Sequence, residues 1–187
     1  RSSLMRYILI YLLLFLFSIS KAYSDIKGQI ISNLEKTNNY SFNFIQQINK
    51  KKETGNCILV FNKKINCKYD KSGKILVSDG KNLVIKSNNS NIPSFYKLKN
   101  TSFYKLLDKD YLIEQLISNN LRKDNERIFF EINYQNIEIK VFFDKKKLYL
   151  SGWETIDAYN NSVFTDIIIY EVNKIVNNNL FNLKEFY

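Results

Sequence analysis

Hydrophobic residues recur at every second position over most of the chain, which is the period of a β-strand with one buried face. The clearest case is residues 40–49, where Tyr40, Phe42 and Phe44 share one face and polar residues mostly occupy the other. The same period predicts further strands, which span Gly55–Phe61, Lys64–Tyr69, Ile75–Ser78, Leu83–Ser87, Ile128–Tyr134, Ile137–Phe143, Leu148–Glu154 and Val163–Val172.

Most connectors between these strands are short and rich in turn-forming residues. Parallel strands need crossovers of about a dozen residues or more, so the short connectors predict an antiparallel meander. The connectors are Asn62-Lys63, Lys71-Ser72-Gly73, Asp79-Gly80, Gln135-Asn136 and Lys145-Lys146-Lys147.

Two segments carry a helical period instead. In Asp25 to Lys36, apolar residues including Ile30 and Leu34 form one face of an opening helix. In Thr101 to Leu121, the apolar spacing predicts one or two helices inserted into the sheet, with Thr101 as the N-cap. A curved sheet covered by such an insert encloses an apolar pocket, although the same side chains also suit an ordinary core.

The first residues have the order of a secretory signal peptide. Arg6 precedes an apolar run from Tyr7 to Ile19, and Ala22 and Ser24 supply small residues. The run has about 13 residues, fewer than the ~20 of a membrane-spanning helix. We expect a signal peptide over residues 1–24, cleavage after Ser24 and a single exported domain over 25–187; the alternative is an uncleaved anchor.

The composition narrows the function classes. The chain has 187 residues, enough for one domain, and a formal net charge of +10. Lysine supplies 24 of the 28 basic residues, whereas nucleic-acid contacts favour arginine, so we expect no nucleic-acid partner. There is no histidine and there are two cysteines, which argues against common hydrolase sites and zinc sites. Hydrolase triads and zinc sites are therefore poor candidates, and we predict no catalytic residue and no metal site.

Cys57 and Cys67 lie on successive predicted strands on either side of the Asn62-Lys63 turn. Pairing about that turn sets them opposite or nearly opposite each other. The spacing permits a cross-strand disulfide in an oxidising compartment, and two buried free thiols are the alternative.

Several short motifs resemble the LolA family of outer-membrane lipoprotein carrier proteins over nearly all of residues 26–185. The run Leu76-Val77-Ser78-Asp79-Gly80-Lys81 and the pair Trp153 and Asp157 are moderately specific. Weaker matches are Phe44, Gln46, Gly55, Tyr69, Leu83, Leu150 and Val163-Phe164-Thr165.

The resemblance implies a mainly β fold with some α: a half-open antiparallel β-barrel with an N-terminal helix and a helical lid over an apolar concave face. It implies a monomeric periplasmic chaperone that takes lipoproteins from an inner-membrane transporter to an outer-membrane receptor. It also implies no enzyme activity and no cofactor. The family often has Arg-Pro at Phe61-Asn62, an Arg that helps hold the lid closed, and Thr-Pro at Thr101-Ser102, so lid control differs here. Candidate residues for the acyl-chain cavity and lid are Phe42, Phe44, Phe61, Ile65, Phe103, Leu106, Leu107, Leu112 and Trp153.

Two other functions stay open at the level of sequence. One is a periplasmic sensor or amphiphile-binding module that uses the same scaffold without transport. The other is a secreted hydrolase, which the missing histidine disfavours. Copurified acyl chains would favour a carrier or a sensor, and turnover of ester substrates would favour the enzyme.

Overall fold

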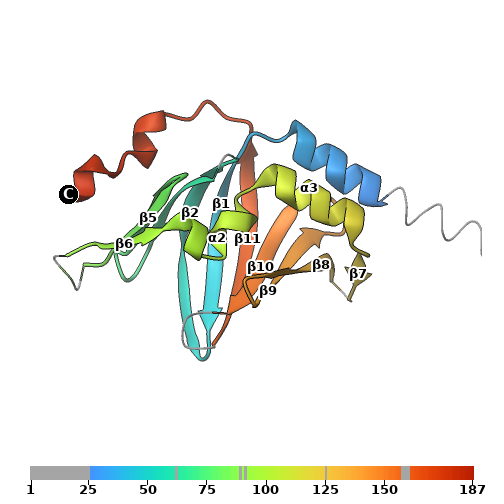
Figure 1. Ribbon diagram of the computed structural model, residues 1–187, viewed down its shortest axis with the longest axis horizontal. Coiled ribbons are helices and arrows are strands. Elements are labelled where there is room, and N and C mark those ends of the chain that lie inside the picture. Colours follow the sequence, from blue (N-terminus) through green and yellow to red (C-terminus); the bar gives the residue numbers. More distant parts are fainter. Residues whose placement is uncertain (1–25, 62, 89, 91, 125, 157–160) are drawn as a thin grey trace, which may run out of the picture.

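A computed structural model describes residues 26–61, 63–88, 90, 92–124, 126–156 and 161–187. Eleven strands form one sheet in the order β6-β5-β4-β3-β2-β1-β11-β10-β9-β8-β7, and every neighbouring pair is antiparallel. The sheet is open, and it curves around the helices on one face (Figure 1). We call the helix-covered face the inner face and the opposite one the outer face.

The strands follow the two-residue period of the sequence. Buried positions alternate clearly in β8, where Ile128, Phe130 and Ile132 point inward. The bounds are β1 Asn39–Ile48, β2 Lys51–Val60, β3 Lys64–Tyr69, β4 Ile75–Asp79, β5 Asn82–Lys86, β6 Ser94–Lys97, β7 Arg122–Lys123, β8 Arg127–Tyr134, β9 Ile137–Asp144, β10 Leu150–Ile156 and β11 Ser162–Val172.

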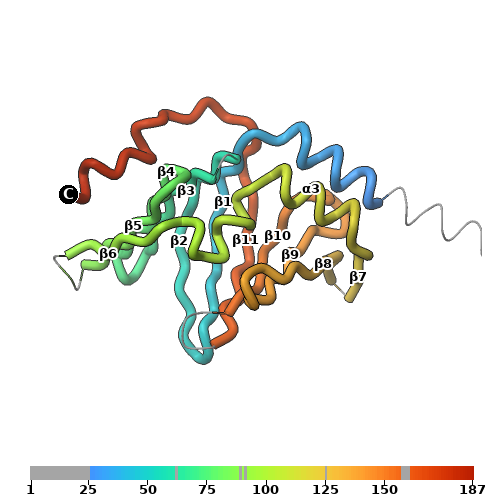
Figure 2. The backbone as a smooth tube through the Cα atoms, in the orientation of Figure 1, coloured from blue at the N-terminus to red at the C-terminus, as the bar shows by residue number. Residues whose placement is uncertain are grey.

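The connection from β6 to β7 crosses the inner face, because these two strands form the opposite edges of the sheet. It contains three short helices, η1 Leu98–Asn100, α2 Phe103–Leu106 and α3 Lys109–Ser118. The topology itself therefore carries the helical insert over the sheet, and we call residues 98–118 the lid (Figure 2).

The N-terminal helix, residues 26–36, lies beside α3, to which it is joined by hydrogen bonds of Lys27 and Lys109 (Figure 1). Its buried residues Ile30 and Leu34 join the same apolar cluster as the sheet and the lid. Asn33 donates from Nδ2 to the carbonyl oxygens of Lys147 and Leu148, 3.2 Å away in each case, and so ties the helix to the turn before β10.

The C-terminal segment returns from β11 to the outer face of β3–β5. It contains two single-turn helices, η2 Asn178–Phe181 and η3 Leu183–Phe186. Leu183 packs with Val77 and Val84 in a second, smaller apolar cluster, and Asn66 donates to the carbonyl oxygen of Leu180 over 2.6 Å.

The hairpin predicted at Asp79-Gly80 is present. Asp79 Oδ1 accepts hydrogen bonds from the backbone N–H groups of Lys81 and Asn82, at 2.8 and 2.7 Å, which is an Asx turn. Gly80 has φ +99°, a left-handed conformation that favours glycine. These contacts explain why the order Ser-Asp-Gly suits the turn between β4 and β5.

The predicted fold class is confirmed: the sheet is antiparallel, open and covered by an N-terminal helix and short helices. The predicted signal peptide over residues 1–24, and Asn62 and Asp157, lie outside the described residues. In the described part of the chain, no helix is long and apolar enough to cross a membrane.

Candidate functional site

Under the lid, the inner face of the sheet is an apolar surface whose side chains the strand register brings together. Phe42 in β1 lies opposite Cys57 in β2 and Ile169 in β11, and Cys57 lies opposite Cys67 in β3. The two sulfur atoms form a disulfide, and both cysteines are buried. The bridge therefore joins two strands in the middle of this face.

The Phe44 ring occupies space that a side chain at position 55 would fill, and residue 55 is a glycine. A Cβ atom on Gly55, its partner in β2, would lie 2.7 Å from the Phe44 ring and 2.1 Å from the Lys68 carbonyl oxygen. The ring packs edge-on against Tyr69, with centroids 4.8 Å apart. Gly55 thus admits an aromatic side chain where another residue would exclude it.

The lid covers this surface with its own apolar side chains. Asp108 begins α3 as its N-cap, accepting a hydrogen bond from the Tyr111 N–H over 3.2 Å. The buried faces of the helices carry Leu106, Leu112 and Leu116. Hydrogen-bonded capping therefore fixes where the helix starts, and the leucines fix which side it turns to the sheet.

The predicted cavity and lid residues lie together in this contact. Trp153 in β10 packs edge-on against Phe42 in β1 and Phe103 in α2, with ring centroids 6.3 and 6.4 Å apart. All of the predicted residues except Phe103 are buried members of one cluster, and Phe103 packs against it. The buried members are Phe42, Phe44, Phe61, Ile65, Leu106, Leu107, Leu112 and Trp153. In this arrangement the lid itself occupies the apolar face.

Lys63, which follows β2, joins the sheet to the lid through three contacts. Its Nζ lies 3.0 Å from Asp108 Oδ2 and 4.4 Å from the centroid of the Tyr104 ring, and its backbone N–H donates to the Leu107 carbonyl oxygen over 3.3 Å. The hydrogen bond to Asp108 raises the pKa of Lys63, so the amine stays charged. We call Lys63 and Asp108 the latch. The latch could not be recognised from the sequence, because neither residue stands out from the many charged ones.

Two further lysines bind the lid to the N-terminal helix. Lys109 donates from Nζ to the carbonyl oxygens of Glu35 and Thr37, at 3.3 and 2.9 Å. Lys27 donates to the Ile117 carbonyl oxygen over 3.0 Å. Each lysine thus meets the C-terminal end of the other helix, where cations are favoured.

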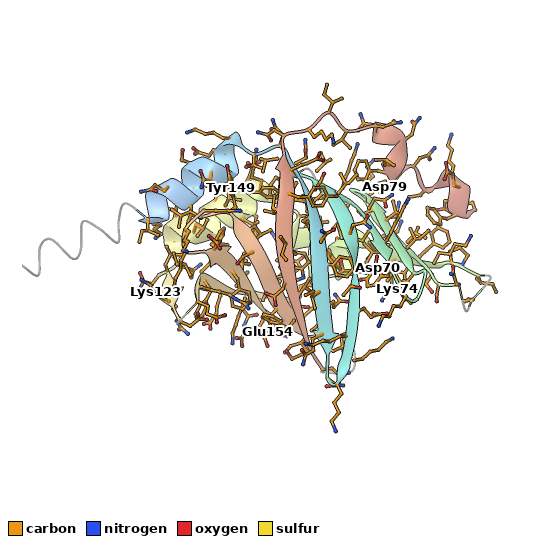
Figure 3. The ribbon with its side chains drawn as sticks, turned by 180° about the vertical axis from the view of Figure 1, so that it is seen from behind. Asp70, Lys74, Asp79, Lys123, Tyr149 and Glu154 are labelled. Carbon is orange, nitrogen blue, oxygen red and sulfur yellow. A yellow bond between two sulfur atoms is a disulfide. The ribbon has the colours of Figure 1, made fainter. Side chains whose placement is uncertain are left out.

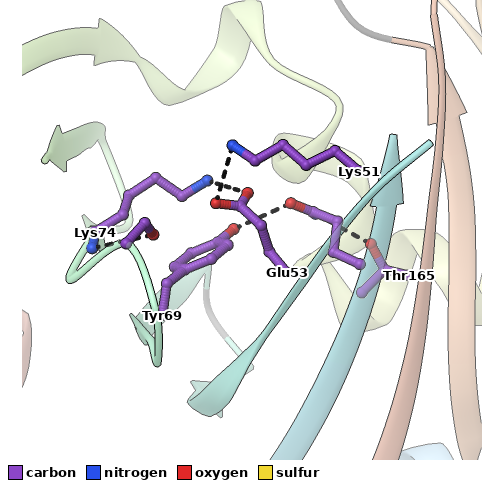
Figure 4. Close-up of polar contacts among 7 residues, drawn as sticks. Lys51, Glu53, Tyr69, Lys74 and Thr165 are labelled. Carbon is purple, nitrogen blue, oxygen red and sulfur yellow. Dashed lines mark hydrogen bonds and ion pairs between the residues drawn. The ribbon is translucent and has the colours of Figure 1, made fainter. Parts of the chain in front are cut away.

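The inner face changes from apolar to polar beyond Phe44, toward the β1–β2 hairpin. Tyr69 donates to Gln46 Oε1 over 3.3 Å, and Gln46 Nε2 donates to Thr165 Oγ1 over 3.2 Å (Figure 4). Beside them, Glu53 Oε2 lies 2.8 Å from Lys74 Nζ, which stands 3.7 Å from the centroid of the Tyr69 ring. We call Gln46, Glu53, Tyr69, Lys74 and Thr165 the polar row.

Charge within the polar row is largely compensated. Partial burial favours the neutral form of Glu53, but the hydrogen bond and charge of Lys74, together with Lys51, outweigh it and lower the pKa of the carboxyl group. Burial raises the pKa of Tyr69, which stays a neutral hydrogen-bond donor. The row therefore presents hydroxyl, amide and ammonium groups next to an apolar surface. Within the described ranges, no group of His, Cys, Asp and Glu side chains could hold a metal ion.

Comparisons with known proteins give only distant matches. No protein-family model and no curated protein sequence matches the chain. A LolA superfamily protein from Nitrosomonas europaea is similar in structure with a TM-score of 0.44 at 7% identity, covering 88% of this chain and 99% of that one.

Two further solved structures are similar at a comparable level. A DUF1329 family protein from Desulfovibrio piger has a TM-score of 0.42 at 10% identity and covers 89% of this chain and 98% of that one. The MucA/MucB complex of Pseudomonas aeruginosa has a TM-score of 0.34 at 11% identity, and the match covers 80% of this chain and 59% of that one. These values do not place the chain in a family.

Proposed function

We propose that the protein is a periplasmic chaperone that binds the acyl chains of lipoproteins between the sheet and the lid and carries them from the inner to the outer membrane. In this proposal residues 1–24 direct export and are removed. The Cys57–Cys67 disulfide supports an oxidising compartment, where such bridges persist.

The observation that carries the proposal is the amphipathic design of the inner face. Its apolar part, centred on Phe42 and Trp153, lies under the lid, and its polar row begins at Gln46 on the same strand as Phe42. A lipid-modified protein has the same order of parts, with hydrocarbon chains followed by amide and ester groups. Acyl chains would take the place of the lid side chains, and the polar groups at their base would meet the polar row.

Energetics favour a lid that moves. Burying acyl chains contributes about 0.8 kcal/mol per CH₂ group, so two chains of ordinary length would bind very tightly to an open apolar cavity. The lid side chains must first leave the sheet, and exposing each leucine costs about 1.5–3 kcal/mol. Displacing the lid therefore lowers the net affinity for acyl chains, which favours release to an acceptor.

The test is release of a labelled lipoprotein from spheroplasts or inner-membrane vesicles by the purified protein. We expect Leu107→Glu to abolish release, because a carboxylate under the lid would face the incoming chains without solvation. Lys123→Glu, on an exposed residue of β7, is the control and should release as much as wild type.

Circular dichroism and urea unfolding establish whether Leu107→Glu still folds. If it does not, Phe103→Asp, at the partly exposed front of the lid, takes its place in the assay. A folded variant of either kind that releases lipoprotein at the wild-type level would show that the lid residues serve only as core.

A further inference from the structure

The sheet contains a split between β10 and β11. Their ladder ends at the pair Gly152 and Asp166, whereas the ladder between β1 and β11 continues as far as Val172. In the described part of the chain, no strand pairs with the β10-facing side of Ile167–Val172. Figure 3 shows the two strands together near Glu154 and apart toward Tyr149.

A bulge in β10 produces this split. The register between β9 and β10 shifts between Leu150 and Gly152, so Ser151 is an extra residue, and such bulges bend a strand. At Gly152 the two strands are in close contact, because an added Cβ atom would lie 2.3 Å from the Thr165 carbonyl oxygen. The strands diverge from this point.

The split is a hollow with an unsatisfied polar atom. It has a volume of about 310 Å³ and is lined by Asp144, Lys147, Tyr149, Leu150, Ser151 and Ile167–Val172. Ser151 Oγ is buried and makes no hydrogen bond, and it is the one such side-chain atom within the described ranges. Buried hydroxyl groups are normally hydrogen-bonded, so this oxygen is available to a polar group that enters the split.

The open side of β11 is longer and more apolar than the outer edges of the sheet, although it carries a bulge at Tyr170 and the charged Glu171. Exposed edges are usually short, charged or interrupted by proline. The outer edges of this sheet follow that rule, since β6 has four residues and β7 consists of Arg122 and Lys123. In the split, by contrast, Ile168 and Tyr170 are 66% and 55% exposed. An exposed apolar edge is the usual template for an added strand.

We propose that the split binds an extended segment of a partner protein, which adds as a strand to β11 with apolar residues alternating with polar ones and an acidic residue near Lys147. Lys147 is the cation of the lining, and the described residues include no ion pair to it. Both carboxylates of the lining are engaged: Asp144 accepts the N–H groups of Lys146 and Lys147, and Glu171 pairs with Lys174.

The probe is the blocked peptide acetyl-Val-Thr-Ile-Glu-Val-Thr-amide, with hydrogen–deuterium exchange of the full chain as the readout. We expect the peptide to slow exchange of the backbone amides within Ile167–Val172. The same peptide with every amide N-methylated cannot form a ladder and should give no protection. Protection that is absent, or equal with the methylated peptide, would overturn the proposal.

Variants locate the site. Ile168→Asp should weaken peptide binding at least about tenfold, because it places a charge in the contact. Ile92→Asp, at an isoleucine 78% exposed in a loop, is the matched control and should leave the affinity unchanged. Ser151→Ala should also weaken binding while leaving the free protein as stable as before, since it removes an unbonded hydroxyl group. Equal affinity in wild type and Ile168→Asp would contradict a site in the split.

Two results separate this proposal from its alternatives. If raising the concentration of the protein alone protects the same amides, a second copy fills the split and the peptide proposal is wrong. Leu107→Glu, which tests acyl binding, should bind the peptide as wild type does, because Leu107 belongs to the lid. Failure of acyl-chain binding under the lid can therefore be distinguished from failure of peptide binding in the split.

Discussion

Lys63 contacts the lid through three groups. Its contacts to Asp108, Tyr104 and Leu107 all belong to the lid, while its own carbonyl oxygen accepts a hydrogen bond from the buried Ser78 hydroxyl over 2.9 Å. The lysine is thus held by the sheet and directed at the lid. It therefore supplies a cation from the sheet to the lid.

We predict that Lys63→Ala loosens the lid without unfolding the sheet. Loss of this partly exposed pair should cost about 1 kcal/mol or less, so the overall stability changes little. Hydrogen–deuterium exchange in residues 102–108 should become several-fold faster. Lys81→Ala, in the exposed turn between β4 and β5, is the control. Unchanged lid exchange in Lys63→Ala would show that the latch has no role in closure.

Glu53 makes the stability of the polar row depend on pH. Its folded-state pKa is lowered, so the ionised form stabilises the fold at pH values above its ordinary pKa, and this stabilisation is lost as the pH falls through the folded-state value. Glu53→Gln should reduce the free energy of unfolding by about 1 kcal/mol near pH ~7. The difference from wild type should shrink at about pH 3. Urea unfolding at both pH values measures it, and a difference independent of pH would contradict the assignment.

Single residues were predicted best where their own strand shows a clear alternation of apolar and polar positions. Phe42 and Phe44 belong to a clear two-residue period, and both lie on the inner face. The polar row was not predicted, because Gln46, Glu53 and Lys74 lie on different segments that only the register of the sheet brings together. The same holds for the bulge at Ser151, which depends on how β9 and β10 align.

At the level of elements, periodicity predicted nine strands to within a few residues at their ends, including β3 at its observed bounds. It missed β6 and β7, because strands of four and two exposed residues show no alternation of buried and exposed positions. It also missed η2 and η3, since a single helical turn is too short for a helical period.

The C-terminal segment offers a prediction at this scale. Removing residues 178–187 takes away Phe181, Leu183 and Phe186 from the outer face, of which the first two are buried. Each buried side chain contributes about 1.5–3 kcal/mol, so the truncated chain should be less stable by several kcal/mol. Hydrogen exchange should accelerate in β3–β5 and stay unchanged in β8–β10. Uniform acceleration over the whole sheet would mean that the segment does not act locally.

At the scale of the whole molecule, the path of the chain explains the site. The strands form a meander in two halves that meet at β1 and β11, and the lid joins the two outer edges. The connection from β6 to β7 must span the sheet from edge to edge, and in this structure it crosses the inner face. The sequence predicted the insert and the apolar face, but whether acyl chains replace the lid there depends on an equilibrium between lid and ligand that no pattern of residues encodes.

Trp153 allows the central claim to be measured directly. It is the one tryptophan of the chain, and it lies between Phe42 in the sheet and Phe103 in the lid. Titration with a lipopeptide that carries brominated acyl chains should quench the Trp153 emission in a saturable manner, and the unbrominated lipopeptide should not. Saturable binding of the lipopeptide by calorimetry without quenching by the brominated form, or no binding at all, would contradict a site beneath the lid.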